Sequence, residues 1–375
     1  MLRKMKLGDC LTLINGRAYK RSELLEEGTP VIRIQNLNGG ENWYYSDLQL
    51  PEEKYCSKGD LLFAWSATFG PFVWDGDKGI YHYHIWKVIP KEKYLDRNYA
   101  YYMFQSITAK IKSAAHGSSM PHYGKGFMEK LEVNLPPIDE QRKIASILDR
   151  SNRIKQGIEQ SLSVRNEFLS SVFLDIFGDS TIENRYQRTT IGDNSLTVSK
   201  GTTPMTHGMD FVSEGIPFLR VQDLVKNPID PLFAAKAIDQ ATHDFLSRSQ
   251  LKPNDILISI AGTIGRISII SKDSPEMNCN QAVAFVRLAE TSVLRHFYLM
   301  HWLNSRDARL QMAGSSVTAT ISNLSLGKIK DLKVPMPPLN LQLQFEKICE
   351  RFDMISTHNG QINGLVDSIT QEMLT

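Results

Sequence analysis

The sequence predicts an α+β fold in which one plan, a globular domain followed by a long helix, occurs twice along the chain. Two observations predict it. Two long segments without proline carry apolar residues at steps of three and four, which is typical of helices that pack along their whole length. The blocks before these segments repeat each other's motifs in the same order, which indicates a tandem duplication with pseudo-two-fold symmetry.

The first long helix is expected over 136–178, because Pro136-Pro137 cannot continue a strand but fits the first turn of a helix. Its apolar seam lacks two positions, which Ser151 and Arg165 fill. A helix of this length, roughly 60 Å at ~1.5 Å per residue, needs a partner along its surface. The residues expected to pack against that partner are Ile144, Ile147, Ile154, Ile158, Leu162, Leu169, Val172 and Ile176.

The second long helix is expected over 336–375 and also opens with a proline pair, Pro337-Pro338. Asn359 is the polar residue of its seam, and a single seam asparagine fixes helix register at some cost in stability. We therefore expect the two helices to form an antiparallel coiled coil; two unrelated core helices are the alternative. The second set of packing residues is Phe345, Ile348, Phe352, Ile355, Asn359, Ile362, Val366 and Ile369.

The two blocks that precede the helices repeat each other. GTPVIRIQNL at 28–37 matches GIPFLRVQDL at 215–224, and Gly-Ser-Ser at 117–119 matches the same triplet at 314–316. The separation between matching residues rises along the chain, as insertions in loops would produce. The predicted domains are therefore a first globular domain, a helix, a second globular domain and a helix, at 1–135, 136–178, 179–335 and 336–375.

Within each block the pattern is mostly typical of strands, with one helix late in the block. The last strand segment of the first block alternates histidine and aromatic residues, which suits a half-buried sheet. The strands are expected at Val31–Ile34, Leu61–Trp65, Ile80–Ile89, Phe218–Val221, Ile256–Ala261 and Arg266–Ile270, and the late helices at Asn98–Ser113 and Val293–Met312.

Composition leaves several classes open. The net charge of +2 neither demands nor excludes a nucleic acid. The four cysteines are far apart and form no CxxC pair, which is typical of free thiols in a reducing compartment. The chain has no apolar run of ~18 residues and its start lacks the core of a signal peptide, so a cytoplasmic location is expected.

No catalytic motif stands out. The sequence contains neither GxxxxGKS nor GxGxxG. Ile138 and Leu339 follow the proline pairs where an amino-methyltransferase motif would need an aromatic residue. The first block holds His82, His84 and two further histidines, but without a pattern of cysteines or carboxylates they indicate structural roles more than a metal site. We expect no catalytic residues, no metal and no cofactor in this chain.

A resemblance to a known family rests on LPPIDEQRKI at 135–144, FLDIFGD at 173–179, MPPLNLQLQFEKI at 336–348 and the segments at 215–224 and 314–339. Over essentially all 375 residues, the chain resembles the specificity subunit of type I restriction–modification systems. The resemblance implies a non-catalytic subunit whose two target-recognition domains each read one half of a split site in double-stranded DNA. It also implies that the helices set the gap and dock two methyltransferase subunits, which bind S-adenosylmethionine, and that restriction subunits can join.

Three groups of residues are candidates for DNA contact, because arginine, asparagine and glutamine suit base edges while lysine and serine suit phosphates. The first group follows the matched strands and has turn capping as its alternative role: Arg33, Gln35, Asn36, Arg220, Gln222 and Asp223. The second lies around the Gly-Ser-Ser triplets, with an ordinary polar loop as its alternative: Ser118, Ser119, Tyr123, Lys125, Ser315, Ser316, Thr318 and Thr320. The third, with core packing as its alternative, is Trp65, Ser66, Thr68, Thr263 and Arg266.

Two rival functions belong to other classes. One is a DNA-modifying enzyme that acts alone, which would methylate or cleave DNA without partners. The other is a structural scaffold without a DNA role, which would bind no duplex even with a methyltransferase present. The specificity subunit is the function that the sequence favours.

Overall fold

The computed structural model describes residues 2–114, 124–224, 229, 234–313 and 324–374, without the side chains at 113, 114, 354–361, 363, 367, 371 and 374. The chain forms two compact units, each described below by itself: unit 1 is 1–156 with 365–375, and unit 2 is 157–364. Both units end inside the long helices α5 (Ile138–Phe177) and α10 (Leu339–Leu374). The domain boundaries expected at 135, 178 and 335 stay predictions.

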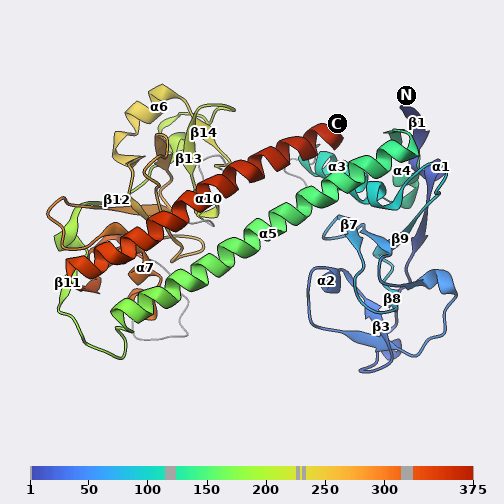
Figure 1. Cartoon of the computed structure of the whole chain (residues 1–375). Helices are drawn as coiled ribbons and strands as arrows, with labels where there is room; N and C mark the ends of the chain where they lie inside the picture. The colour runs from blue at the N-terminus through green and yellow to red at the C-terminus, as the bar shows by residue number, and fades with distance from the viewer. Residues whose placement is uncertain (1, 115–123, 225–228, 230–233, 314–323, 375) are drawn as a thin grey trace. The chain divides into compact units, whose positions relative to one another are not determined.

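Unit 1 contains three sheets (Figure 1). Two have four strands, in the orders β2-β9-β6-β7 and β4-β3-β8-β5, and the third pairs β1 with β10. Only the β3–β8 pair among these is parallel. The strands are β1 (Arg3–Lys6), β2 (Leu11–Asn15), β3 (Thr29–Ile32), β4 (Tyr44–Ser46), β5 (Tyr55–Cys56), β6 (Leu61–Ala64), β7 (Gly70–Val73), β8 (Gly79–Tyr81), β9 (Ile85–Pro90) and β10 (Glu132–Leu135).

Unit 2 repeats this topology strand for strand. Its sheets have the orders β12-β19-β16-β17, β14-β13-β18-β15 and β11-β20, again with one parallel pair, β13–β18. The tandem duplication and the α+β class are therefore confirmed. The strands are β11 (Arg188–Thr190), β12 (Ser195–Lys200), β13 (Ile216–Leu219), β14 (Ala237–Ile238), β15 (Gln250–Leu251), β16 (Ile256–Ser259), β17 (Ile267–Ile269), β18 (Met277–Cys279), β19 (Val283–Leu288) and β20 (Lys333–Pro335).

Short helices complete both units. In unit 1, α3 covers one four-stranded sheet: Phe63 of β6 contacts Phe104 of α3 at 5.1 Å between ring centroids and stacks on Trp86 of β9 at 5.7 Å. The helices are α1 (Leu7–Cys10), α2 (Ile34–Leu37), α3 (Arg97–Ala114) and α4 (Lys125–Lys130) in unit 1, and α6 (Gln240–Phe245), α7 (His296–Leu303), α8 (Arg306–Ala313) and α9 (Leu326–Asp331) in unit 2.

The two long helices also supply core residues. In unit 2, Phe173 of α5 contacts Tyr298 of α7 and Phe345 of α10, with centroids 5.6 and 5.5 Å apart. In unit 1, Ala145 and Leu148 of α5 are buried in the core under α3. Each long helix is therefore built into a globular core by part of its length, and burial of these apolar side chains stabilises that part.

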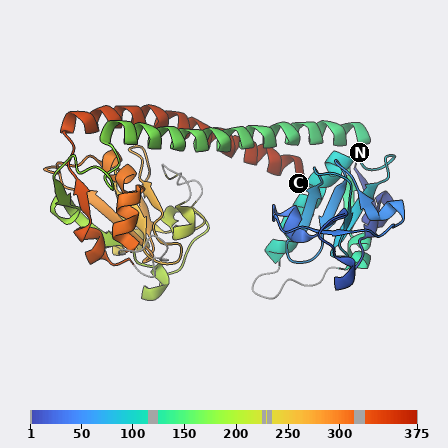
Figure 2. The same cartoon turned by 90° about the horizontal axis from the view of Figure 1, so that it is seen from below.

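Within unit 2 the two long helices lie side by side and antiparallel, as the sequence predicted (Figures 1 and 2). Arg165 pairs with Asp353 at 3.7 Å, and Phe168 contacts Phe352 with centroids 5.5 Å apart. Further along α5, Phe173 meets Phe345. Residue numbers thus rise along α5 while those of its contacts fall along α10.

The residues expected to pack between the helices fall into three sets. Buried or partly buried are Ile144, Ile158, Leu162, Leu169, Val172, Ile176, Phe345, Ile348, Phe352 and Val366, and also Ser151 and Arg165. At the surface, with 37% to 47% of their area exposed, are Ile147, Ile154, Ile362 and Ile369. The side chains of Ile355 and Asn359 lie outside the described residues. Near the start of α5, Ala145 and Leu148 are buried instead of Ile147, because that part of the helix rests on the core of unit 1.

Two expected elements differ from the structure in kind, and the strands expected to end at Ile34 and Val221 end at Ile32 and Leu219. The segment at 80–89 is not one strand: β8 and β9 belong to different sheets, and residues 82–84 form the turn between them. The helix expected over Val293–Met312 is two helices, α7 and α8, which break at Asn304-Ser305. Ser305 accepts a hydrogen bond from the Ala308 amide at 3.4 Å, a contact typical of the start of a helix.

Candidate nucleic-acid interface

The first candidate group lies where β3 and β13 end, and its side chains fold back on their own loops. Asn36 accepts a hydrogen bond from the Arg33 amide at 3.1 Å, and Gln35 donates to the Asn42 carbonyl at 2.7 Å. In unit 2, Asp223 accepts from the Arg220 amide at 2.8 Å in the same way. Asn36 and Asp223 therefore act as turn caps, while Gln35 and Gln222 have exposed side chains.

The third candidate group lies beside the first in both units. In unit 1, Thr68 accepts a hydrogen bond at 3.0 Å from Asn38, the residue that ends α2. In unit 2, the Arg266 guanidinium donates to the Val221 carbonyl at 3.1 Å, and the Thr263 carbonyl accepts from Ser259 at 2.6 Å. Segments 33–38 and 65–68 thus meet in unit 1, and segments 220–224 and 259–266 meet in unit 2.

Most of the second group lies outside the described residues: Ser118, Ser119, Tyr123, Ser315, Ser316, Thr318 and Thr320. The remaining member, Lys125, opens α4 and forms an ion pair with Glu129 at 3.6 Å. A role in DNA binding stays a prediction for all three groups.

A feature that the sequence analysis placed in a strand completes this region: the β8–β9 turn, His82-Tyr83-His84. The His82 amide donates to the Ile32 carbonyl at 2.9 Å, directly before Arg33. The Trp65 amide donates to the His84 carbonyl at 3.0 Å, and the Trp65 indole donates to the Tyr83 carbonyl at 2.8 Å. Backbone hydrogen bonds therefore join the turn to the first and third candidate groups.

The β18–β19 turn of unit 2, Asn280-Gln281-Ala282, is held in the same way. The Asn280 amide donates to the Leu219 carbonyl at 3.0 Å, directly before Arg220, and the Ile260 amide donates to the Ala282 carbonyl at 2.8 Å. Both units thus build one surface region from the same three segments, with different side chains on it. In unit 1, the alternation of histidine with aromatic residues at 80–89 is the sequence signal for this region; it predicts a half-buried strand, and residues 82–84 form a turn instead.

The side chains of the unit 1 turn form an aromatic cluster. Tyr83 lies 3.8 Å from the His84 ring and 6.0 Å from Trp65, measured between centroids, while Trp65 stacks on Trp86 at 6.0 Å. Burial, and then the charges of His84 and Arg33, lower the pKa of His82 to about 4, so this imidazole is neutral at physiological pH. Among the described residues, no group of three or more histidine, cysteine or carboxylate side chains is arranged to hold a metal ion.

Comparison with known proteins identifies the family. A model described as the type I restriction modification DNA specificity domain matches residues 2–164 and 193–366, which is most of the chain and covers both units. The chain belongs to this family. Its function is therefore DNA specificity in a type I restriction–modification system, as the sequence predicted.

Relatives of this specificity protein cover nearly its whole length. It is 25% identical to the type I restriction enzyme EcoBI specificity subunit of Escherichia coli, over 99% of this chain and 84% of that protein. The MjaVIII specificity subunit of Methanocaldococcus jannaschii is 22% identical over 90% of this chain and 83% of its own. The crystal structure of the type I restriction–modification system S subunit from M. genitalium matches the fold with a TM-score of 0.56 at 15% identity, over 100% of this chain and 95% of that one.

The proline pairs that mark this specificity protein lead into matched joints between helix and domain. Buried Gln141 donates to the carbonyls of Tyr94 and Pro136 at 2.9 and 2.8 Å and accepts from the Asp96 amide at 2.9 Å. In unit 2, buried Gln342 donates to Val293 and Pro337, both at 2.9 Å, and accepts from the Arg295 amide at 2.8 Å. The amide of each glutamine thus fixes the direction in which its helix leaves the proline pair.

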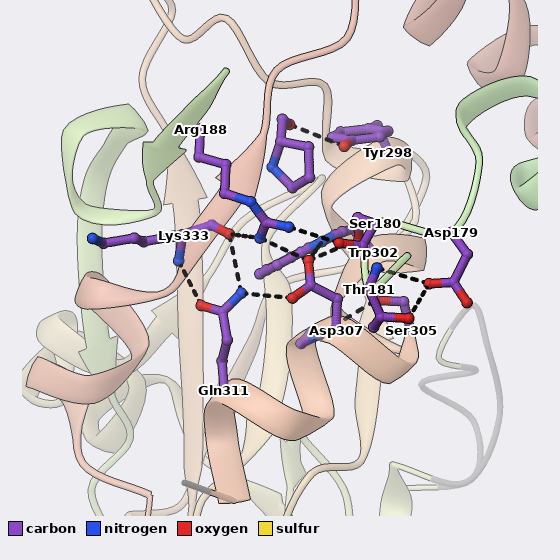
Figure 3. A network of polar contacts seen from close by, with 12 residues as sticks. Asp179, Ser180, Thr181, Arg188, Tyr298, Trp302, Ser305, Asp307, Gln311 and Lys333 are labelled. Carbon is purple, nitrogen blue, oxygen red and sulfur yellow. Dashed lines mark hydrogen bonds and ion pairs between the residues drawn. The ribbon is translucent and has the colours of Figure 1, made fainter. Parts of the chain in front are cut away.

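A second joint holds the segment after α5 to the body of unit 2 (Figure 3). Asp307 of α8 accepts hydrogen bonds from Ser180 at 2.7 Å and Arg188 at 2.8 Å, and from the Trp302 indole at 3.3 Å. Gln311 donates to the other oxygen of Asp307 at 3.0 Å and bonds the Lys333 backbone. The partners of Asp307 all belong to unit 2, which indicates a structural role for this network.

Proposed function

We propose that each unit of this chain reads one half of a split site in double-stranded DNA, and that α5 and α10 set the gap and dock two methyltransferase subunits. The single observation that carries the proposal is the repeat of one surface region with different side chains. Two units with the same backbone topology but different surface side chains suit a target whose two halves differ in sequence. Because a wrong base pair typically costs ~1–3 kcal/mol, two heads together discriminate more steeply than one.

The length of α5 limits the gap. Its 40 residues span about 60 Å at ~1.5 Å per residue. DNA rises ~3.4 Å per base pair, so two heads joined by such a helix could reach half-sites at most roughly 18 base pairs apart. Two heads that read the same face of the duplex favour half-site centres about one turn, or ~10 base pairs, apart.

In this proposal the chemistry belongs to the partners. S-adenosylmethionine binds the methyltransferase subunits, which flip and methylate the target adenine in their own pockets. Restriction subunits join the same assembly, and the complex works in the cytoplasm. Burial supports a non-catalytic role for the cysteines of this chain, since it raises the pKa of Cys10 to about 11 and that of Cys56 to about 12, far from the range of a reactive thiolate. No helix in the described part of the chain is long and apolar enough to cross a membrane.

The test is to map methylated bases across the genome of cells that carry the partner methyltransferase, with and without this gene. We expect a split motif with two unlike halves and a constant gap, which disappears on deletion. Replacing residues 1–135 with the matching domain of another family member should change one half only. Methylation that survives deletion would place specificity elsewhere and favour a scaffold; methylation by the purified chain alone would favour an enzyme.

A further inference from the structure

The β8–β9 turn of unit 1 and the β18–β19 turn of unit 2 share one backbone arrangement but carry different side chains. A glycine packs against each turn in the same way: the Gly16 amide donates to the Ile85 carbonyl at 3.0 Å, and the Gly201 amide to the Val283 carbonyl at 3.1 Å. A Cβ atom at Gly16 would lie 2.2 Å from the His82 carbonyl oxygen, and one at Gly201 would lie 1.9 Å from the Cys279 carbonyl oxygen. No side chain fits at either position, so in both units the chain passes close to the turn only because the residue there is glycine.

The middle residue of each turn points its side chain to solvent. Tyr83 exposes 39% of its area, and Gln281 in the equivalent place is also exposed. Neither is needed to hold the turn, because the bonds that hold it run through backbone atoms. Tyr83 and Gln281 therefore occupy the same position on the backbone of the two units but expose different chemical groups to solvent.

Neighbouring side chains restrict the orientation of both Tyr83 and Gln281. Tyr83 packs against His84 and Trp65, so its ring loses little freedom on meeting a ligand. The Thr203 hydroxyl donates to the side-chain carbonyl of Gln281, which orients that amide. Pre-oriented polar and aromatic groups are what recognition of a base edge requires.

We propose that Tyr83 and Gln281 are specificity-determining residues, each contacting base edges in the half-site that its unit reads. The inference rests on the proposed function and adds to it the segment that makes the two halves different. An amide such as that of Gln281 pairs in two places with the adenine edge in the major groove, through N6 and N7. A phenol such as that of Tyr83 offers one hydroxyl and an apolar ring, which suits a thymine methyl group or a single hydrogen bond.

Two of the DNA-contact candidates predicted from the sequence lie next to these turns. Arg33 and Arg220 directly follow Ile32 and Leu219, whose carbonyls accept hydrogen bonds from the two turns, and they are the same residue type in both units. Residues shared by both units cannot make the two halves different, whereas their charge suits the phosphates that every site carries. Difference in sequence preference is thus expected from the turns, and common affinity from the arginines.

The test uses the whole chain with its methyltransferase in cells, and reads the methylated motif by sequencing. Gln281→Ala should relax one base-pair position, an A·T pair, in one half-site, with a roughly 10-fold or greater gain of methylation at sites that differ there. Tyr83→Ala should relax the other half-site and leave the first unchanged. Tyr83→Phe keeps the ring and removes the hydroxyl, so it separates a hydrogen bond from an apolar contact.

Matched controls lie in the same units. Ile89→Ala removes a side chain of similar exposure from β9, and Gln240→Ala removes an exposed amide from α6; neither should change the motif. Thermal unfolding of each purified variant shows whether it folds like the parent. If the parent chain directs no split motif, the proposed function fails. If the parent does so and folded Tyr83 and Gln281 variants keep its motif unaltered, the inference alone is overturned.

Discussion

Units 1 and 2 agree in their strand orders and differ in the side chains of the β8–β9 and β18–β19 turns. The strand orders are the same, and the glutamine after each proline pair makes the same set of bonds, through Gln141 in unit 1 and Gln342 in unit 2. The turn at 82–84 carries two histidines and a tyrosine, whereas the turn at 280–282 carries two amides and an alanine. Backbone hydrogen bonds hold the turns, so their side chains can change without changing the fold.

The helix pairing also differs between the copies. In unit 2, α10 carries the fully buried ring of Phe345, and its pairing with α5 includes the ion pair of Arg165 with Asp353. A shift of 201 residues, which superposes the two proline pairs, places Ile144 on Phe345 and Asn152 on Asp353. At these two positions α5 therefore carries a smaller apolar residue and an uncharged one. Substitutions at Phe345, Ile144 and Asp353 measure how much that difference matters.

The largest effect is expected from truncating the aromatic core of unit 2. Phe345→Ala removes a ring that contacts Phe173, Phe177 and His301, and should cost about 3–5 kcal/mol of unfolding free energy. Its counterpart Ile144→Ala, at a partly buried position, should cost less, about 1–2 kcal/mol. Urea denaturation with hydrogen exchange resolved by unit measures both, and equal costs would contradict the difference in packing.

Asp307→Asn tests a joint of unit 2 that rests on one carboxylate. It keeps the side-chain shape but leaves Arg188 without its charged partner, and should destabilise unit 2 by about 2–4 kcal/mol. Hydrogen exchange should quicken around 180–188 before it does in the core. Asp193→Asn, at an exposed position of the same unit, is the control and should stay within about 0.5 kcal/mol. A stability unchanged by Asp307→Asn would show that the network is dispensable.

Replacing Gln141 or Gln342 should lower the stability of its own unit by a similar amount. Gln141→Ala and Gln342→Ala each leave buried backbone groups without partners, and each should cost about 1–3 kcal/mol in its own unit. Gln240→Ala, with one exposed bond to Asp244, should cost almost nothing. Denaturation midpoints of the three variants measure these costs. A loss of stability in only one of the two glutamine variants would show that the two helices are fixed at their starts in different ways.

The smallest effect is a pH dependence confined to unit 2. Burial raises the pKa of Asp353 to about 6, although Arg165 opposes the shift. A carboxyl whose pKa is raised on folding stabilises the folded state most below its unfolded pKa, near 4, and this contribution is lost as the pH rises through 6.

The advantage of the parent over Asp353→Asn should therefore shrink by about 1–2 kcal/mol between pH 4 and 7. Burial lowers the pKa of His301 to about 3, which gives the opposite trend, but both chains share that histidine and the difference between them cancels it. Urea denaturation of both chains across this range is the measurement. A difference independent of pH would contradict the raised pKa.

The sequence alone determined the plan of the molecule. Proline pairs, the apolar seams and the matched motifs at 28–37 and 215–224 depend on short-range patterns, and these are visible without coordinates. They predicted the tandem α+β domains and the antiparallel helices, which the structure confirms. Ser151 and Arg165, the two polar residues that fill gaps in the first seam, are buried. The role of Asn36 and Asp223 as turn caps was stated as an alternative, and the hydrogen bonds of the two turns support it.

Only the tertiary structure decided which segments meet. The alternation at 80–89 has the period of a strand, but the chain turns at 82–84 because β8 pairs with β3 and β9 pairs with β6, in two different sheets. The choice of Ala145 and Leu148 over Ile147 as buried residues likewise depends on the core of unit 1, since a helix buries the face that its neighbours cover and not always its most apolar one. Long-range pairing brought Tyr83 beside Trp65 and Gln281 beside Thr203, and no spacing along the chain encodes those contacts.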